Sequence, residues 1–129
     1  NDFDNIIISY LLESHIYITF SFRDSCPNAV IESMAFGLPV IATTSGGLPD
    51  IVGDAGILVE ISDVIDGYYS AHRFECDFPL IDYSEVIKSI KIITKDSKWY
   101  RSNVERRFEE ELHIKVIAEK YRKVLVDLS

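Results

Sequence analysis

The stretch SFRDSCPNAVIESMAFGLPVIATTSGGLPD, from Ser21 to Asp50, decides the fold that this sequence predicts. Its first residues are polar and typical of a turn, and its middle predicts a helix over Pro27–Phe36. Proline is favoured in a first helical turn, Ser25 is a candidate N-cap, and Gly37 suits the position just past the helix. The segment PVIAT (Pro39–Thr43) then has the composition of a buried strand, and SGGLPD after it that of a turn.

Strands of similar composition flank this stretch and predict a parallel sheet. Ile16–Phe20 (IYITF) precedes it and Ile57–Glu60 (ILVE) follows it. Because strand, helix and strand alternate, we expect an α/β fold, a partial Rossmann-like parallel sheet flanked by helices. Further helices are expected at Tyr83–Ile93, Lys98–Phe108 and Ile114–Leu128, which close the fold, with an irregular excursion over Ile61–Asp82. The apolar run Ile6–Leu12 could be strand or helix, and a short helix ending near Ser14 is favoured.

The composition excludes several classes of partner. The 129 residues carry a formal net charge of −8, whereas nucleic-acid binding needs clustered basic side chains. The basic residues between Lys88 and Lys123 are interleaved with glutamates, which is typical of solvated helix faces with ion pairs. No run approaches the roughly 18 apolar residues of a membrane span. Cys26 and Cys76 have no metal-ligand spacing and form no disulfide framework, so we expect two thiols in a cytoplasmic protein.

The residues from Ser21 to Asn28 form a loop that leads from a strand into a helix, where ligands bind in parallel α/β sheets. The helix start offers unpaired N–H groups and a positive dipole end, which favour a phosphate. Two carboxylates, Asp24 and Glu32, flank it and would accept hydrogen bonds from hydroxyls. Eight helical steps rise about 12 Å, too far for a hydrolase pair of carboxylates. A long ligand with hydroxyls at both ends and phosphate between them, a nucleotide sugar, fits this spacing. On the spacing alone, the alternative that Asp24 only complements the helix dipole and that Glu32 is a solvated helix residue stays open.

Two segments of the chain resemble a known family. They are FSFRDSCPNAVIESMAFGLPVIA (Phe20–Ala42) and TSGGLPDIVGDAGILVE (Thr44–Glu60). Together they resemble the donor-binding half of the large retaining family 4 group of glycosyltransferases, which have the GT-B fold. That family carries two glutamates separated by seven residues, followed by a paired glycine. The similarity runs without a gap from about Ile16 to Glu60.

The resemblance implies a role for each matching residue. Glu32 would bind the donor ribose hydroxyls, and Asp24, the catalytic candidate, would contact the transferred sugar and stabilise charge developing on it. The other donor-binding candidates are Ser25, Cys26, Pro27, Asn28, Gly46 and Gly47. Two departures bear on the site. Asp24 replaces a glutamate, which shortens the reach by one methylene, and Ser25-Cys26 replaces the family's Gly-Phe beside the donor.

The resemblance also implies the activity. We expect a glycosyltransferase of polysaccharide biosynthesis that moves a hexose from a nucleotide sugar to a carbohydrate or lipid-linked acceptor with retention, with no cofactor or metal. Residues 1–129 are expected to be part of the C-terminal donor domain, inactive alone, with the acceptor domain and the start of the donor domain absent. Peripheral membrane contact through that absent half stays open. The alternatives are a non-catalytic nucleotide-sugar-binding or docking module and a sugar-nucleotide epimerase of the same fold.

Overall fold

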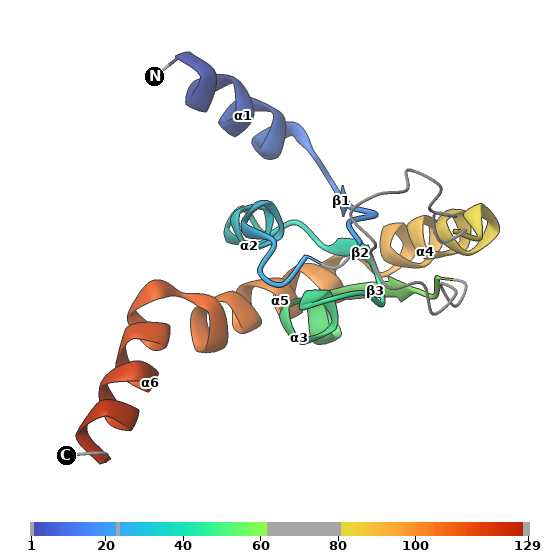
Figure 1. Ribbon diagram of the computed structural model, residues 1–129. Helices are drawn as coiled ribbons and strands as arrows, with labels where there is room; N and C mark the ends of the chain where they lie inside the picture. Colours follow the sequence, from blue (N-terminus) through green and yellow to red (C-terminus); the bar gives the residue numbers. More distant parts are fainter. Residues whose placement is uncertain (1, 23, 62–80, 128–129) are drawn as a thin grey trace, which may run out of the picture.

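A computed structural model describes residues 2–22, 24–61 and 81–127 of the chain (Figure 1). Helices and strands alternate through the first half, and the named elements in the described part of the second half are helices. In chain order the elements are α1 (Asp2–Glu13), β1 (Tyr17–Ile18), α2 (Asn28–Ala35), β2 (Val40–Thr43), α3 (Leu48–Val52), the 3-10 helix η1 (Gly53–Ala55), β3 (Gly56–Val59), α4 (Tyr83–Lys95), α5 (Ser97–Arg107), the π-helix η2 (Phe108–Leu112) and α6 (Ile114–Asp127).

The three strands form one parallel sheet in the order β1-β2-β3. In the register, Tyr17 lies beside Val40, and Val40 lies beside Gly56. Every residue of the central strand β2 is buried, because β2 has a neighbour on both sides and helices over both faces. The predicted α/β class and parallel sheet are therefore confirmed.

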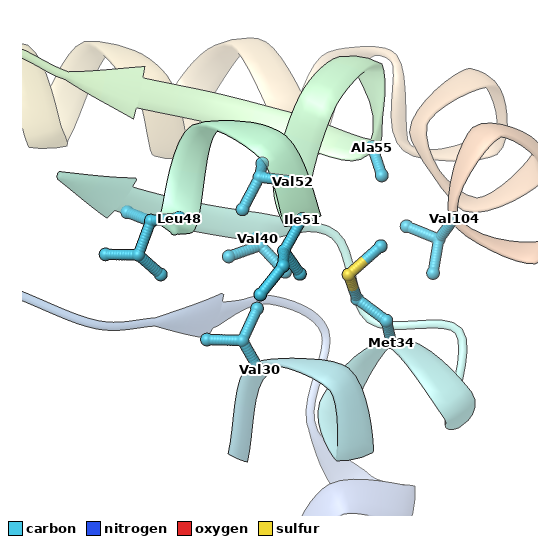
Figure 2. Packing of buried hydrophobic residues seen from close by; sticks show 9 residues of the cluster. Val30, Met34, Val40, Leu48, Ile51, Val52, Ala55 and Val104 are labelled. Atoms are coloured by element: carbon cyan, nitrogen blue, oxygen red, sulfur yellow. The ribbon is translucent and has the colours of Figure 1, made fainter. Parts of the chain in front are cut away.

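Alternate residues of β2 face the two apolar layers that hold the sheet. On one side Val40 and Ala42 pack with α2 and α3, which contribute Met34 and Leu48 (Figure 2). Val104 of α5 closes this cluster and is fully buried. On the other side Ile41 packs against α4. This alternation is the two-residue period of a strand, with helices covering each face.

The end of α2 follows the predicted pattern. Gly37 has a positive φ of 73°, its N–H donates to the Met34 carbonyl, and the Leu38 N–H donates to the Ser33 carbonyl. These two bonds form a Schellman motif, which satisfies the last carbonyls of the helix. The chain then turns directly through Pro39 into β2.

Two predicted details are wrong. SGGLPD was expected to be a turn, but its second half belongs to α3, which has proline in its first turn and buries Leu48, Ile51 and Val52. Glycine and proline mask a helix this short because they are typical of turns. The first strand was expected over Ile16–Phe20 but spans Tyr17–Ile18, because it pairs only with β2 and lies at the sheet edge.

The C-terminal helices lie close to their predicted positions. The helix predicted over Lys98–Phe108 begins at Ser97 and continues past Arg107 as the π-helix η2. The predicted irregular excursion lies, apart from its ends, outside the described residues; Ile61 and Ile81 at those ends form an antiparallel bridge. None of the described helices has the length and apolar character needed to cross a bilayer. Figure 1 shows α1 and α6 leading away from the sheet at the two ends of the chain.

Candidate functional site

Two loops meet beyond the carboxyl ends of β1 and β2. The first leads from β1 into α2 and carries Asp24, and the second leads from β2 into α3 and carries the paired glycine. The backbone N–H of Gly47 donates a 2.9 Å hydrogen bond to the carbonyl oxygen of Asp24. The structure therefore brings together two segments that lie more than twenty residues apart in the sequence.

Both glycines are required by this close approach. Gly46 has φ of 61°, and a Cβ atom there would lie 2.2 Å from the Asp24 carbonyl oxygen. A Cβ on Gly47 would lie 2.4 Å from the carbonyl oxygen of Ser25. Real Cβ atoms do not approach backbone this closely, so any side chain would push the two loops apart. At both positions, the space that a side chain would need is occupied by the backbone of the Asp24 loop. Contact of these glycines with a donor stays a prediction.

The Asp24 side chain is part of its own loop. Its Oδ1 atom accepts a 3.1 Å hydrogen bond from the N–H of Cys26, an arrangement typical of aspartate in turns. Asp24 is half-buried, whereas Ser25 and Cys26 are exposed, and the Cys26 thiol is free. The second carboxylate oxygen of Asp24 has no protein partner among the described residues.

The start of α2 is not capped by a side chain. Pro27 is the N-cap residue, with φ of −71° and ψ of 90°, and its carbonyl accepts the N–H groups of Val30 and Ile31. The expected cap by Ser25 is therefore wrong, because the helix begins one residue later than predicted and Pro27 occupies the cap position. The N–H groups of Asn28 and Ala29 have no hydrogen-bond acceptor among the described residues. They are the donors that an anion at this helix start would use.

Glu32 lies on the exposed face of α2. The helix buries Val30, Ser33 and Met34, whereas Glu32 and Asn28, four residues apart, share the outer face. Within the described ranges Glu32 makes no ion pair or side-chain hydrogen bond. Its carboxylate is therefore available to a ligand that reaches along the outer face of the helix.

Hydroxyl groups at the strand ends were missed by the sequence reasoning. Thr43 Oγ1 donates to the Ser21 carbonyl at 2.8 Å and so connects the end of β2 to the first loop. Thr44 Oγ1 donates to a carboxylate oxygen of Glu60 at 3.2 Å and connects the ends of β2 and β3. Hydroxyl and acidic residues placed directly after apolar strands could have identified them, because parallel strand ends meet at one edge of the sheet.

This edge of the sheet offers hydrogen-bonding chemistry. Helix N–H groups can bind an anion, and the carboxylates of Asp24 and Glu32 can accept from hydroxyls. In the described part of the chain no three His, Cys, Asp or Glu side chains are grouped to hold a metal ion.

Comparison with known proteins supplies the family. Residues 3–72 match the family model described as glycosyl transferases group 1. That range contains every predicted site residue and ends before α4. A search of curated proteins finds none that matches the chain. Because the family model covers more than half of the 129 residues, the chain belongs to the group 1 glycosyltransferases.

Proposed function

We propose that this chain forms donor-binding surface of a retaining glycosyltransferase whose donor is a nucleotide sugar and whose acceptor is a carbohydrate or a lipid-linked sugar. The observation that carries the proposal is the junction between the Asp24 loop and the paired glycine, directly beside the open start of α2. The family match supports transfer of a sugar from a donor to an acceptor in general.

The diphosphate of the donor would bind at the start of α2. The N–H groups of Asn28 and Ala29, which bond no acceptor among residues 2–22, 24–61 and 81–127, supply donors, and the helix dipole adds roughly half a positive charge there. In retaining transfer the diphosphate gains negative charge as the bond to the sugar breaks. Donors held in place before the reaction stabilise that charge without reorganisation, which lowers the barrier.

The two carboxylates would bind the two ends of the donor. Glu32 is exposed on the face that it shares with Asn28, so a nucleoside leading away from the diphosphate can reach its carboxylate. An ionised carboxylate accepts hydrogen bonds from both ribose hydroxyls. Asp24 would receive a sugar hydroxyl on its second oxygen, because Oδ1 already accepts from Cys26.

Calorimetric titration tests the binding part of this proposal. We expect the chain to bind one of UDP, GDP and ADP at millimolar concentration or tighter, and Glu32→Ala to weaken that binding about tenfold through loss of charge-assisted hydrogen bonds. Glu105→Ala is the matched control, because Glu105 is also an exposed helical glutamate without a side-chain ion pair in the described residues. No binding of any nucleotide, or equal loss in both variants, would contradict the proposal.

One observation favours a second candidate, a nucleotide-sugar-binding module without catalysis. The Asp24 carboxylate is engaged in its own loop, so its role could be to shape that loop. Asp24→Asn separates the two roles, because an amide oxygen can still accept from Cys26 while the charge is removed. If Asp24 contacts the sugar, this variant should lose affinity for UDP-glucose or GDP-mannose while binding the matching nucleoside diphosphate normally. Unchanged affinity for both would favour the module.

A further inference from the structure

The guanidinium of Arg107, at the end of α5, holds the end of α3. Its Nε donates to the carbonyl oxygen of Ile51 at 2.8 Å, and one terminal nitrogen donates to the carbonyl oxygen of Asp50. The other terminal nitrogen pairs with the carboxylate of Glu111 at 3.1 Å. The Arg107 side chain is only 14% exposed. Its planar fork of donors therefore satisfies two of the last carbonyls of α3.

The backbone around Arg107 leaves room for this contact. Gly53 directly follows α3 and has a φ of 47°. A Cβ atom there would lie 2.6 Å from the guanidinium carbon of Arg107, so a side chain at this position would displace the arginine. The glycine thus leaves the space that the guanidinium occupies at the end of the helix.

A series of hydrogen bonds leads from Arg107 to the Asp24 loop, which joins β1 to α2. Ile51, whose carbonyl accepts from Arg107, donates its own N–H to the Gly47 carbonyl at 3.2 Å. Gly47 in turn donates its N–H to the Asp24 carbonyl at 2.9 Å. Three hydrogen bonds therefore connect Arg107 with Asp24 through one short helix. Because α3 has only five residues, its own hydrogen bonds do little to hold it in place.

We propose that Arg107 is a positioning residue, which fixes α3 and thereby holds the paired glycine and Asp24 in the geometry that binds the donor. The role of Arg107 in donor binding rests on the proposed function. The connection from Arg107 to the Asp24 loop rests only on the hydrogen bonds described above. Arg107 lies outside residues 3–72, so the family match does not include it.

The neighbouring arginine provides a matched control. Arg106 pairs with the Asp54 carboxylate in η1 and with Glu110 at 3.6 Å, and its side chain is 43% exposed. Arg106 carries the same charge as Arg107 and lies in the same helix, but its described hydrogen bonds reach no carbonyl of α3. Removing the Arg106 side chain should therefore loosen η1 while leaving the hydrogen bonds that lead from α3 to the Asp24 loop intact.

Amide hydrogen exchange, followed residue by residue by NMR, tests the link without any ligand. In Arg107→Gln we expect the Gly47 amide to exchange about tenfold faster than in the wild type, relative to the Ala42 amide in buried β2, because local opening becomes easier. Arg107→Lys, a milder variant, should give a smaller increase in the same ratio because one ammonium replaces the fork. Arg106→Gln should leave the ratio unchanged. Equal acceleration of Gly47 and Ala42, or none, would overturn the proposal and assign Arg107 to general stability.

Titration with UDP, GDP and ADP separates this proposal from the proposed function. If the wild-type chain binds one of them, Arg107→Gln should weaken that binding at least about fivefold and Arg106→Gln by less than about twofold. Equal loss in both variants would overturn the positioning role. If the wild-type chain binds none, the proposed donor site fails, while the exchange ratio still decides whether Arg107 holds the loop.

Discussion

The first turns of α2 and α4 differ in how their backbone N–H groups are satisfied. At α4 the carboxylate of Asp82 accepts the N–H of Ser84 at 2.8 Å, and its backbone carbonyl accepts from Glu85 and Val86. At α2 the N-cap residue is Pro27, which has no side-chain acceptor, and only its carbonyl takes part. The helix start without a side-chain cap, that of α2, directly follows the loop that carries Asp24.

This difference indicates where a ligand would be accommodated. Unpaired N–H groups at a helix start can be satisfied by a side chain, by water or by a ligand. Asp82 completes α4 from within the chain, so α4 offers little to an anion. Pro27 leaves the N–H groups of Asn28 and Ala29 without an acceptor among the described residues. The contact of Gly46 and Gly47 with the Asp24 loop holds the backbone beside them in place.

The strongest test of the comparison removes the contact beside α2. Gly46→Ala should lower the free energy of unfolding by roughly 3 kcal/mol or more, because the new Cβ meets the Asp24 carbonyl in addition to the cost of a positive φ. Gly37→Ala is the control, since Gly37 also has a positive φ but has open space around its Cβ position. It should cost only about 1 kcal/mol. Equal losses in urea denaturation would show that crowding against the loop contributes nothing.

A smaller effect is expected from removing the cap of α4. Asp82→Ala should lower Tm by a few degrees at pH 7, whereas Ser25→Ala, near the uncapped α2, should leave Tm unchanged. Hydrogen bonds from the side chain and backbone of Ser84 lower the pKa of the Asp82 carboxyl in the folded chain.

The pH dependence of this effect follows from the sign of that shift. A lowered folded-state pKa stabilises the protein above the unfolded pKa of about 3.9, and the benefit is lost as the pH falls through the lower, folded value. The Tm difference between wild type and Asp82→Ala should therefore be present at neutral pH and shrink under strong acid. A difference that grows on acidification would contradict this role for the carboxylate.

The weakest expected effect is direct anion binding at the open helix start. Adding inorganic pyrophosphate at low ionic strength should shift the NMR signals of the Asn28 and Ala29 amides, because these N–H groups have no acceptor in the part of the chain that the structure describes. The amides of Ser84 and Glu85 should not shift, since Asp82 already accepts from both. Shifts at both helix starts, or at α4 alone, would show that the start of α2 does not bind the anion preferentially.

Much of the fold could be predicted from local patterns. The apolar runs that form β2 and β3, and the glycine that ends α2, are readable within a few residues because their signals are periodicity and turn chemistry. The helix α3 was missed because Gly46, Gly47 and Pro49 are typical of turns, and its burial depends on packing against α2 and β2. The basic residues were expected to be solvated, yet Arg107 is largely buried against α3.

The sequence predicted which residues belong to the site better than it predicted the contacts among them. The sequence pointed to Asp24, Glu32 and the paired glycine, and the structure brings Asp24 and the glycines into contact. The expected cap by Ser25 was wrong, because preference for a cap residue does not determine where the first helical hydrogen bond forms. The links from Thr43 to Ser21 and from Thr44 to Glu60 needed the register of the sheet.

The sequence by itself determined the order of the strands and of every α-helix except α3, because propensity and periodicity act over a few neighbouring residues. Its motifs also carried the family resemblance of Ile16–Glu60. Only the tertiary structure decided that Gly46 and Gly47 face the Asp24 loop, and that Arg107 holds α3. Those contacts join segments distant in the chain, and they exist only where the parallel sheet and its helices place backbone groups within hydrogen-bonding distance.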